Sequence, residues 1–199
     1  MQELLIATQN PGKRREIQAL LADLPLKLVL PAELGIEIDV SEDGDTYADN
    51  AVIKAKAYHA SSHLVVLADD SGLEVDALDG APGLHSARYS PQPGASDADR
   101  RRLLLKNLAG KQRPWTAYFH CTVALADTQG GIHLAEGSCP GQIIPEERGT
   151  NGFGYDPIFL LDGINKTMAE LGMDEKNRLS HRARAILVAK PLLAKIFQL

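Results

Sequence analysis

The sequence has little of what disulfide-bonded, membrane-spanning or nucleic-acid-binding proteins require. Only two of its 199 residues are cysteines, Cys121 and Cys139, and their apolar, strand-like surroundings favour buried thiols over a disulfide framework or a zinc site. No apolar run is long enough to cross a bilayer, and no signal pattern precedes the first predicted strand. With 21 Lys+Arg against 26 Asp+Glu the formal net charge is -5, so nothing draws the whole chain to nucleic acid or to an anionic membrane. We therefore expect a soluble, cytoplasmic protein that binds neither.

Two familiar catalytic motifs are also missing. The spacing GxxxxGK[ST] does not occur, which argues against a P-loop nucleotide hydrolase. No GxSxG elbow is present, although a Ser-His-Asp triad through Ser71 stays open. The histidines are scattered, and none makes a metal-ligand spacing with a cysteine or another histidine.

The stretch Leu64–Leu73, LVVLADDSGL, organises the rest of the sequence. Four apolar residues lead into Asp69 and Asp70 and then a Ser-Gly turn, a pattern that predicts a buried strand ending in two carboxylates. Open α/β sheets carry their chemistry at such carboxyl ends. Adjacent carboxylates repel unless a cation, a proton or hydrogen bonds hold them, so the pattern invites a divalent metal. A turn without any metal is the alternative.

Strands and helices are predicted along most of the chain. Turn residues and hydrophobic periodicity place helices after Pro11, from a cap at Asp45 or Thr46 to about 59, at 100–108 behind a cap at 96–97, and over 174–198. In the last of these, Ser180 starts a new helix and Pro191 kinks or ends it. Besides the strand that starts at Leu64 and ends in the two aspartates, strands are predicted at 4–8, 26–30, 74–78, 115–126, 132–139 and 158–161. The two longest form an antiparallel hairpin on which a second lobe could be built.

The turn Thr8–Lys13 has the parts of an anion site. It offers a hydroxyl, an amide, backbone N–H groups at a helix start and a lysine that can reach back over them. The helix dipole and unpaired amides favour phosphate at such a place. A plain capped helix start with a solvated Lys13 is the alternative.

An acidic loop precedes the second predicted helix. Glu42 and two following aspartates supply carboxylates, and Asn50 and Lys54 lie one helical turn apart on that helix. If the loop packs beside Asp69 and Asp70, Glu42 could complete an oxygen-rich magnesium site. A solvated helix entrance that complements the dipole is the alternative.

Two further segments could contact a ligand. Residues 149–156, GTNGFGYD, hold three glycines around Phe153, whose ring is free to stack on a planar ligand or to anchor the loop. His181 and Arg182 follow Ser180 at a helix start, where cations oppose the dipole. Two donors in that place suggest an anionic or carbonyl-bearing ligand, although an ion pair with an acidic side chain would serve as well.

Five motifs occur in the order and spacing of one protein family: ATQNPGKRREI, EDGDTYADNAVIKA, ADDSGLEVDALDGAPGLHSARYS, GTNGFGYDPIF and DEKNRLSHRARA. From Thr8 to beyond Arg182 the sequence resembles the non-canonical purine nucleoside triphosphate pyrophosphatases, the Ham1-like family. The resemblance implies an α/β fold with a mixed central sheet flanked by helices. It implies one domain over residues 1–199 with two lobes around a substrate cleft, the second at roughly 115–150. It also implies a cytoplasmic homodimer, for which we expect the loop Asp79–Gly94 as the interface.

By the same resemblance, the activity is magnesium-dependent hydrolysis of ITP, dITP and XTP to the monophosphate and pyrophosphate. Asp70 would be the general base and a metal ligand, Glu42 and Asp69 would assist with the metal, and Lys54 would neutralise phosphate charge. The implied substrate-binding residues are Thr8, Gln9, Asn10, Pro11, Gly12, Lys13, Ser71, Phe153, Gly154, Tyr155, Asp156, Lys176, His181 and Arg182. The first six would hold the triphosphate, Ser71 would lie near the metal, and the others would enclose the nucleoside and base.

Selectivity would rest on position 6 of the purine. A donor such as Arg182 can bond a keto oxygen but not an amino group, and a site built in this way can reject the wrong group by roughly 10⁴-fold. Departures from the family pattern are small. Asp49 stands where Glu is common, which leaves a supporting role of that side chain open, and Gln9 occupies a variable position.

Two other functions stay open from the residues alone. The same phosphate and metal site could serve another modified nucleotide, such as a damaged pyrimidine triphosphate. The chain could also be a nucleotide-binding regulatory module that does not hydrolyse its ligand.

Overall fold

A mixed sheet flanked by helices forms the framework of the computed structural model, which describes residues 1–199. The helices are α1 (Pro11–Leu20), α2 (Tyr47–Ser62), α3 (Asp97–Leu108), α4 (Met173–Leu179) and α5 (His181–Phe197). The strands are β1 (Gln2–Ile6), β2 (Leu26–Val29), β3 (Val65–Val75), β4 (Pro82–Gly83), β5 (Trp115–Ala126), β6 (Ile132–Ile143) and β7 (Phe159–Leu161). None of the helices combines the length and apolar character that a bilayer span needs.

Hydrogen-bonded strands follow the order β2-β1-β3-β5-β6-β7, and β4 pairs with β3 off this path. Strand β1 is parallel to β2 and β3, whereas β4 is antiparallel to β3 and β7 to β6. The prediction of an α/β fold with a mixed central sheet is therefore confirmed.

The chain divides into two compact units. Unit 1 comprises Met1–Asp70, Cys121–Gly137 and Arg182–Leu199. Unit 2 comprises Ser71–His120 and Ser138–His181. Two of the four positions at which the chain passes from one unit to the other lie between candidate site residues, at 70–71 and at 181–182. A second lobe at roughly 115–150 stays a prediction.

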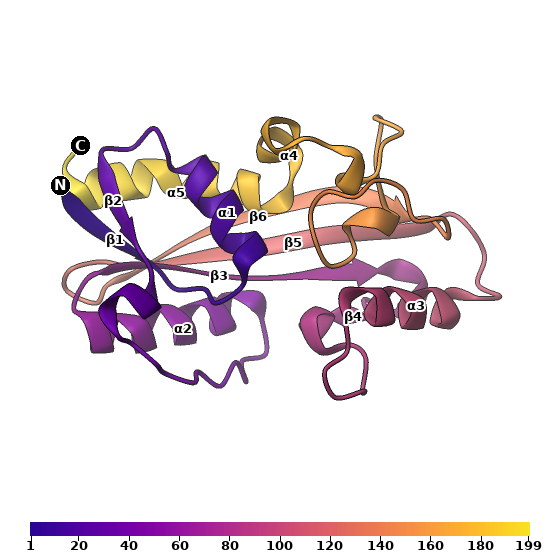
Figure 1. Ribbon diagram of the computed structural model, residues 1–199, viewed down its shortest axis with the longest axis horizontal. Helices are drawn as coiled ribbons and strands as arrows, with labels where there is room; N and C mark the ends of the chain where they lie inside the picture. Colours follow the sequence, from indigo (N-terminus) through magenta and orange to yellow (C-terminus); the bar gives the residue numbers. More distant parts are fainter. The chain divides into compact units, whose positions relative to one another are not determined.

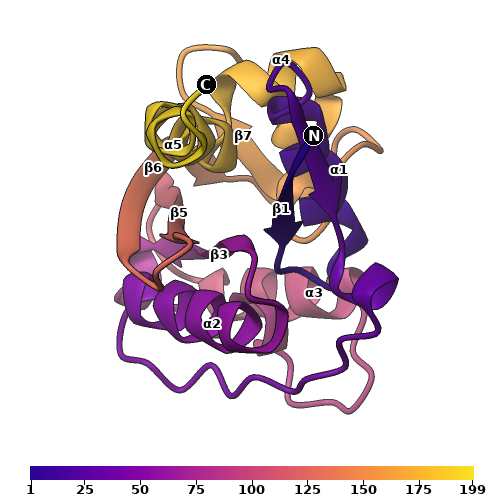
Figure 2. The ribbon, with the colours of Figure 1, turned by 90° about the vertical axis from the view of Figure 1, so that its left-hand side faces the viewer.

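Alternation of side chains along the strands gives unit 1 two cores, one on each face of its strands. On β1, Leu4 and Ile6 belong to one cluster and Leu5 to the other, and β3 and β5 alternate in the same way. Residues of α1 and α5 cover the first cluster and residues of α2 cover the second. The ribbon shows these helices on opposite sides of β1 (Figure 1, Figure 2). Strands buried on both faces explain the continuous apolar runs in the sequence.

Unit 2 has one core cluster of its own. Trp115 and Phe119 of β5 pack there with Leu104 and Leu108 of α3. Residues from the segment after β6, among them Tyr155, complete the cluster. The glycine-rich loop is thus fixed to the same core as α3.

Predicted helix starts agree with the structure. Thr46 Oγ1 accepts from the backbone N–H of Asp49 at 3.1 Å at the start of α2, and Ser96 Oγ accepts from that of Asp99 at 3.2 Å at the start of α3. Both caps are confirmed. Pro191, predicted to kink or end a helix, lies inside α5 and is not its boundary.

Strand β3 is longer than the sequence predicts. The pattern predicts a strand that ends in Asp69 and Asp70, a Ser-Gly turn and a separate strand at 74–78, but one strand runs through both aspartates and Ser71 to Val75. The predicted turn is therefore wrong. Because successive residues of a strand point to opposite faces, Asp69 and Asp70 leave the strand on opposite sides.

Substitution of two glycines of unit 2 tests how tightly the loops that contain them are packed. Gly149 and Gly163 both have positive φ, +80° and +73°, but only at Gly149 would an added Cβ overlap the backbone of Ala169. We expect Gly163→Ala to cost about 1–2 kcal/mol from the left-handed backbone alone. Gly149→Ala should cost roughly 2 kcal/mol more because its methyl group also has no space. Urea unfolding measures both, and equal losses would contradict the packing at Ala169.

Candidate active site

Asp69 lies at the centre of a buried set of charges in unit 1. Its side chain is 1% exposed, and its Oδ2 lies 3.0 Å from Lys13 Nζ and accepts from Arg182 Nε at 3.1 Å. Arg182 is equally buried, and its Nη1 donates to Glu16. Burial alone would raise the pKa of Asp69, but Lys13 and Arg182 hold it well below its usual range. The Asp69 carboxylate is therefore a permanent negative charge that fixes two cations.

Asp70 lies on the side of β3 that faces α2. Its Oδ2 accepts from Asn50 Nδ2 at 3.1 Å, and the Oδ1 of Asn50 accepts from the backbone N–H of Gly44 at 2.8 Å. Asn50 thus connects Asp70 to the acidic loop. Burial raises the pKa of Asp70 above its usual value, two lysines oppose this shift, and the charge of Glu42 adds to it. Ionised Asp70 therefore gains from any further cation nearby.

Lys54 connects the same acidic loop to β3. Its Nζ donates to the backbone carbonyl of Asp69 at 3.0 Å and lies 3.0 Å from Glu42 Oε1. The side chain of Lys54 is only 12% exposed. The acidic loop thus lies beside the two aspartates. This is the packing that we expect if Glu42 takes part in a metal site.

The carboxylates near Lys54 fit a magnesium ion that is bound together with phosphate. Asp70 and Glu42 offer hard oxygen donors, and their mutual repulsion is what a divalent cation relieves. No group of three or more His, Cys, Asp or Glu side chains is arranged to hold a metal by itself. Mg²⁺ is commonly held by one or two carboxylates with substrate phosphates and water, so a pair suffices. Asp69 fits less well, because its Oδ2 already faces Lys13 and Arg182.

The turn Thr8–Lys13 leads from β1 into α1. Thr8 Oγ1 accepts from the backbone N–H of Asn10 at 3.2 Å, and Asn10 Oδ1 accepts from those of Gly12 and Lys13 at 2.8 and 3.1 Å. These amides are already engaged, whereas the sequence predicts exposed amides for an anion. The attraction of this turn for an anion therefore rests on Lys13 and the helix dipole.

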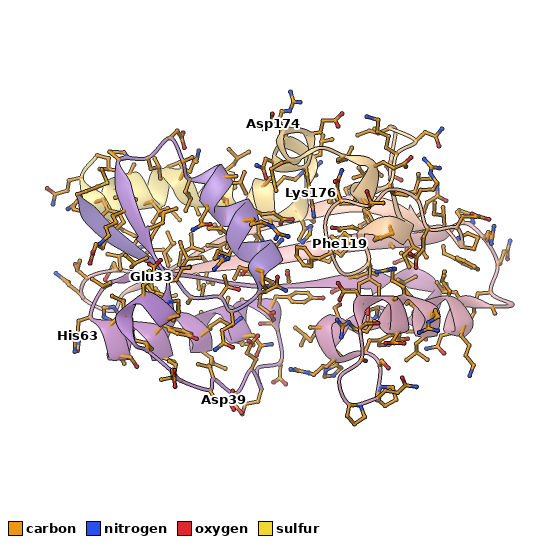
Figure 3. All side chains as sticks on the ribbon, viewed as in Figure 1. Glu33, Asp39, His63, Phe119, Asp174 and Lys176 are labelled. Atoms are coloured by element: carbon orange, nitrogen blue, oxygen red, sulfur yellow. The ribbon has the colours of Figure 1, made fainter.

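A second polar group lies in unit 2. Lys176 and Asp156 are each 4% exposed and pair at 2.6 Å, and Asp156 Oδ2 also accepts from the backbone N–H of Phe153 at 2.9 Å. The Nζ of Lys176 lies 5.0 Å from the centroid of the Phe153 ring. Lys176 lies on the inner side of α4, whereas Asp174 points outward (Figure 3). One carboxylate thus holds both the lysine and the loop that carries the aromatic ring.

Aromatic contacts orient His181. Its ring stacks on Phe119 with centroids 4.7 Å apart and planes at 14°, and Phe119 contacts Phe159 at 4.5 Å. Near this cluster, the hydroxyl of Tyr155 donates to the backbone carbonyl of Ser86 at 2.9 Å, and burial raises the pKa of Tyr155. Tyr155 therefore stays a neutral donor.

The predicted site residues fall into two sets. Unit 1 brings together Lys13, Glu42, Lys54, Asp69, Asp70 and Arg182, and unit 2 brings together Phe153, Asp156 and Lys176. The roles assigned to all of them stay predictions.

Two contributors were not predicted. Asn50 has a sequence signal, because it lies one helical turn before Lys54 on α2. Glu16 has none, since a lone glutamate among charged helix residues is usually solvated, yet it is 3% exposed and bonded to Arg182.

Comparisons with known proteins place this chain in a family. The model of the Ham1 family matches residues 4–191. The dITP/XTP pyrophosphatase of Desulforamulus reducens is 44% identical over 195 residues, which cover 98% of this chain and 97% of that protein. That of Geobacter sulfurreducens is 44% identical over 192 residues, or 96% of each chain.

Solved structures agree with this match. A HAM1 protein from Coxiella burnetii has a TM-score of 0.88 at 40% identity and covers 98% of this chain and 100% of its own. The nucleoside-triphosphatase / dITP/XTP pyrophosphatase from Mycobacterium abscessus has a TM-score of 0.75 at 38% identity, over 96% and 99% of the two chains. Sequence and fold agree over nearly the full length, and the chain belongs to the Ham1 family.

Proposed function

We propose that this protein hydrolyses the non-canonical purine nucleotides ITP, dITP and XTP to the monophosphate and pyrophosphate, and so removes deaminated purines from the nucleotide pool. The observation that carries the proposal is the pair Asp70 and Glu42 flanked by Lys13 and Lys54, in a chain whose relatives are dITP/XTP pyrophosphatases. Carboxylates beside lysines are the groups that a metal-assisted reaction at phosphorus needs.

The residues of unit 1 act on the phosphates. Lys13 and the turn that carries it bind the triphosphate, and Lys54 stabilises the charge that develops on the phosphoryl oxygens. Asp70 and Glu42 would hold Mg²⁺, with Asp69 assisting less because its Oδ2 pairs with Lys13 and Arg182, and the ion would neutralise phosphate charge. Asp69 and Arg182 hold Lys13 in its position.

Asp70 is the general base. It takes a proton from the water that attacks the α-phosphorus in line, and the pyrophosphate leaves from the opposite side. Burial raises the pKa of this carboxyl in the metal-free protein, and a bound cation would favour the ionised form that acts as the base. Asn50 holds the carboxylate in one orientation during the step.

The residues of unit 2 bind the nucleoside. Phe153 stacks on the base, and Asp156 fixes both its loop and Lys176. Lys176, His181 and Arg182 donate hydrogen bonds to the keto oxygen at position 6 of the purine. An amino group at that position is itself a donor and leaves these side chains without an acceptor. Nε and Nη1 of Arg182 already donate to Asp69 and Glu16. We therefore assign the larger share of purine recognition to the donors of unit 2.

We further propose one domain with two lobes around a cleft, the second at roughly 115–150, and a cytoplasmic homodimer with Asp79–Gly94 at its interface. The pairing of β4 with β3 gives part of this loop a fixed position. Light scattering decides the oligomeric state, and a mass near that of the monomer would remove the interface.

A panel of triphosphates tests the substrate class. With magnesium, ITP, dITP and XTP should be turned over and ATP should be slower by roughly 10⁴-fold, because its 6-amino group leaves buried donors unpaired. Phosphorus NMR should show pyrophosphate as the product. Release of single phosphates, equal turnover of ATP and ITP, or preference for a modified pyrimidine triphosphate would sink the proposal.

Neighbouring aspartates should respond oppositely to removal of their charge. The folded-state pKa of Asp70 is raised, so its ionisation costs stability above the usual pKa of 3.8, and Asp70→Asn should stabilise the metal-free protein at pH 7. The pKa of Asp69 is lowered, so Asp69→Asn should destabilise it, by about 3–5 kcal/mol, since two cations lose their partner. The loss in Asp69→Asn should shrink as the pH falls below 3.8 toward the lowered folded-state pKa, and the gain in Asp70→Asn should shrink as the pH falls through the raised folded-state pKa toward 3.8.

Urea unfolding at several pH values measures these stabilities, and turnover is measured on the same proteins. Asp70→Asn should lower kcat by about 10²–10⁴-fold as the loss of a general base. A stable Asp70→Asn protein with near-normal pyrophosphate release would remove Asp70 as the base. If the wild type and Asp70→Asn bind dITP with the same affinity and neither hydrolyses it, the protein would instead be a regulatory module.

A further inference from the structure

The glycine-rich loop that carries Phe153 has no packing that fixes one of its peptides. Gly154 has a φ of +61°, and a Cβ added there would meet nothing within 4 Å. A glycine in open space has more freedom than any other residue. Gly154 has no side chain that could fix its peptide, so the orientation of that peptide depends on hydrogen bonds to its backbone, next to the bond by which Asp156 holds the N–H of Phe153.

Helix α3 supplies these bonds at both polar groups of Gly154. The backbone N–H of Gly154 donates to Asp97 Oδ2 at 2.7 Å, and its carbonyl accepts from Arg101 Nη1 at 2.8 Å. Asp97 and Arg101 are four residues apart and lie on the same face of α3. Two charged side chains on one rigid helix thus hold one glycine from its two ends.

Arg101 is itself fixed by the segment that leads into the loop. Its Nε and Nη2 donate to the two carboxylate oxygens of Glu147 at 2.8 and 2.9 Å, a fork that allows one orientation of the guanidinium. The Arg101 side chain is 12% exposed, and the pKa of Glu147 is lowered by its bond to Arg101. Arg101 therefore ties the start of the loop, at Glu147, to Gly154.

We propose that Asp97 and Arg101 are positioning residues that set Phe153 for nucleoside binding by clamping the Gly154 peptide from α3. The inference rests on the proposed function, because it assigns the base-stacking role to Phe153. Neither side chain touches the reacting atoms. Loss of the clamp should therefore weaken binding of the nucleoside and leave the chemical step unchanged.

Arg101→Met tests the clamp, with Arg102→Met as its control. Arg102 is the next residue on α3, is 74% exposed and pairs only within the helix, with Asp99. Arg101→Met should raise KM for dITP by about tenfold, as expected for lost bonds to a charged group, with kcat within about twofold. Arg102→Met should leave both constants at wild-type values.

Conservative variants separate positioning from general stability. Arg101→Lys keeps the charge, but all its N–H donors lie on one nitrogen and cannot form the fork with Glu147. Its KM should therefore lie between those of the wild type and Arg101→Met. Glu147→Gln, at an exposed position, keeps the fold and loosens the fork, and should raise KM by a smaller factor. A fall in kcat at unchanged KM, or equal KM values for Arg101→Met and Arg102→Met, would overturn the proposal.

Amide hydrogen exchange tests the clamp without any substrate. The N–H of Gly154 should be protected in the wild type and should exchange at least tenfold faster in Asp97→Ala, with Arg102→Met as the control on the same helix. An unprotected Gly154 in the wild type contradicts the clamp whatever the activity. If the wild type fails to hydrolyse dITP and XTP but protects Gly154, the proposed function fails while the clamp itself stands.

Discussion

The two-residue period of strand β3 is the constraint on which the charged cluster of unit 1 depends. It turns two neighbouring carboxylates, Asp69 and Asp70, to opposite faces, each with its own helix cover. On one face Lys13 and Arg182 pair with Oδ2 of Asp69, and on the other Asp70 accepts from the uncharged amide of Asn50. Two neighbouring residues of the same type therefore have different surroundings, one paired with cations and one not.

The anchored face gains its value from the separation of its parts along the chain. Glu16 and Lys13 come from α1, Arg182 from α5 and Asp69 from β3, so the buried charges connect elements far apart in sequence. Burying an arginine is costly unless its charge is paired, and the carboxylates of Asp69 and Glu16 accept from Nε and Nη1 of Arg182. Such a set specifies one arrangement of these elements rather than adding much to stability, because an apolar cluster of equal volume would stabilise them as well.

Much of the fold can be predicted from local patterns. Apolar periodicity and capping side chains locate α1, α2 and α3, since Thr46 and Ser96 act through bonds to residues three positions away. The pattern fails at Asp69-Asp70-Ser71-Gly72, where turn-forming residues stand inside a strand because buried partners from elsewhere in the sequence satisfy them. Turn propensity is a local quantity, and tertiary contacts outweigh it at this place.

The candidate residues can be found from the sequence because they lie in local motifs, whereas their partners cannot. Lys13, Lys54 and Asp70 lie in distinctive motifs, whereas Glu16 and Arg101 are ordinary helix residues whose partners are 166 and 53 positions away in the chain. No local pattern reports such a pairing. Only folding brings Glu147 and Gly154 to one guanidinium.

The ionised side chains around β3 have a consequence for how ligands bind. Three cations, Lys13, Lys54 and Arg182, face four carboxylates, Glu16, Glu42, Asp69 and Asp70, so this set carries a net charge of 3 − 4 = −1. Under the proposed function, a nucleoside triphosphate by itself would meet groups whose net charge has its own sign, and a divalent cation would reverse that sign. The two would then be thermodynamically coupled ligands. Linkage would make the effect reciprocal, with each raising the affinity for the other by the same factor.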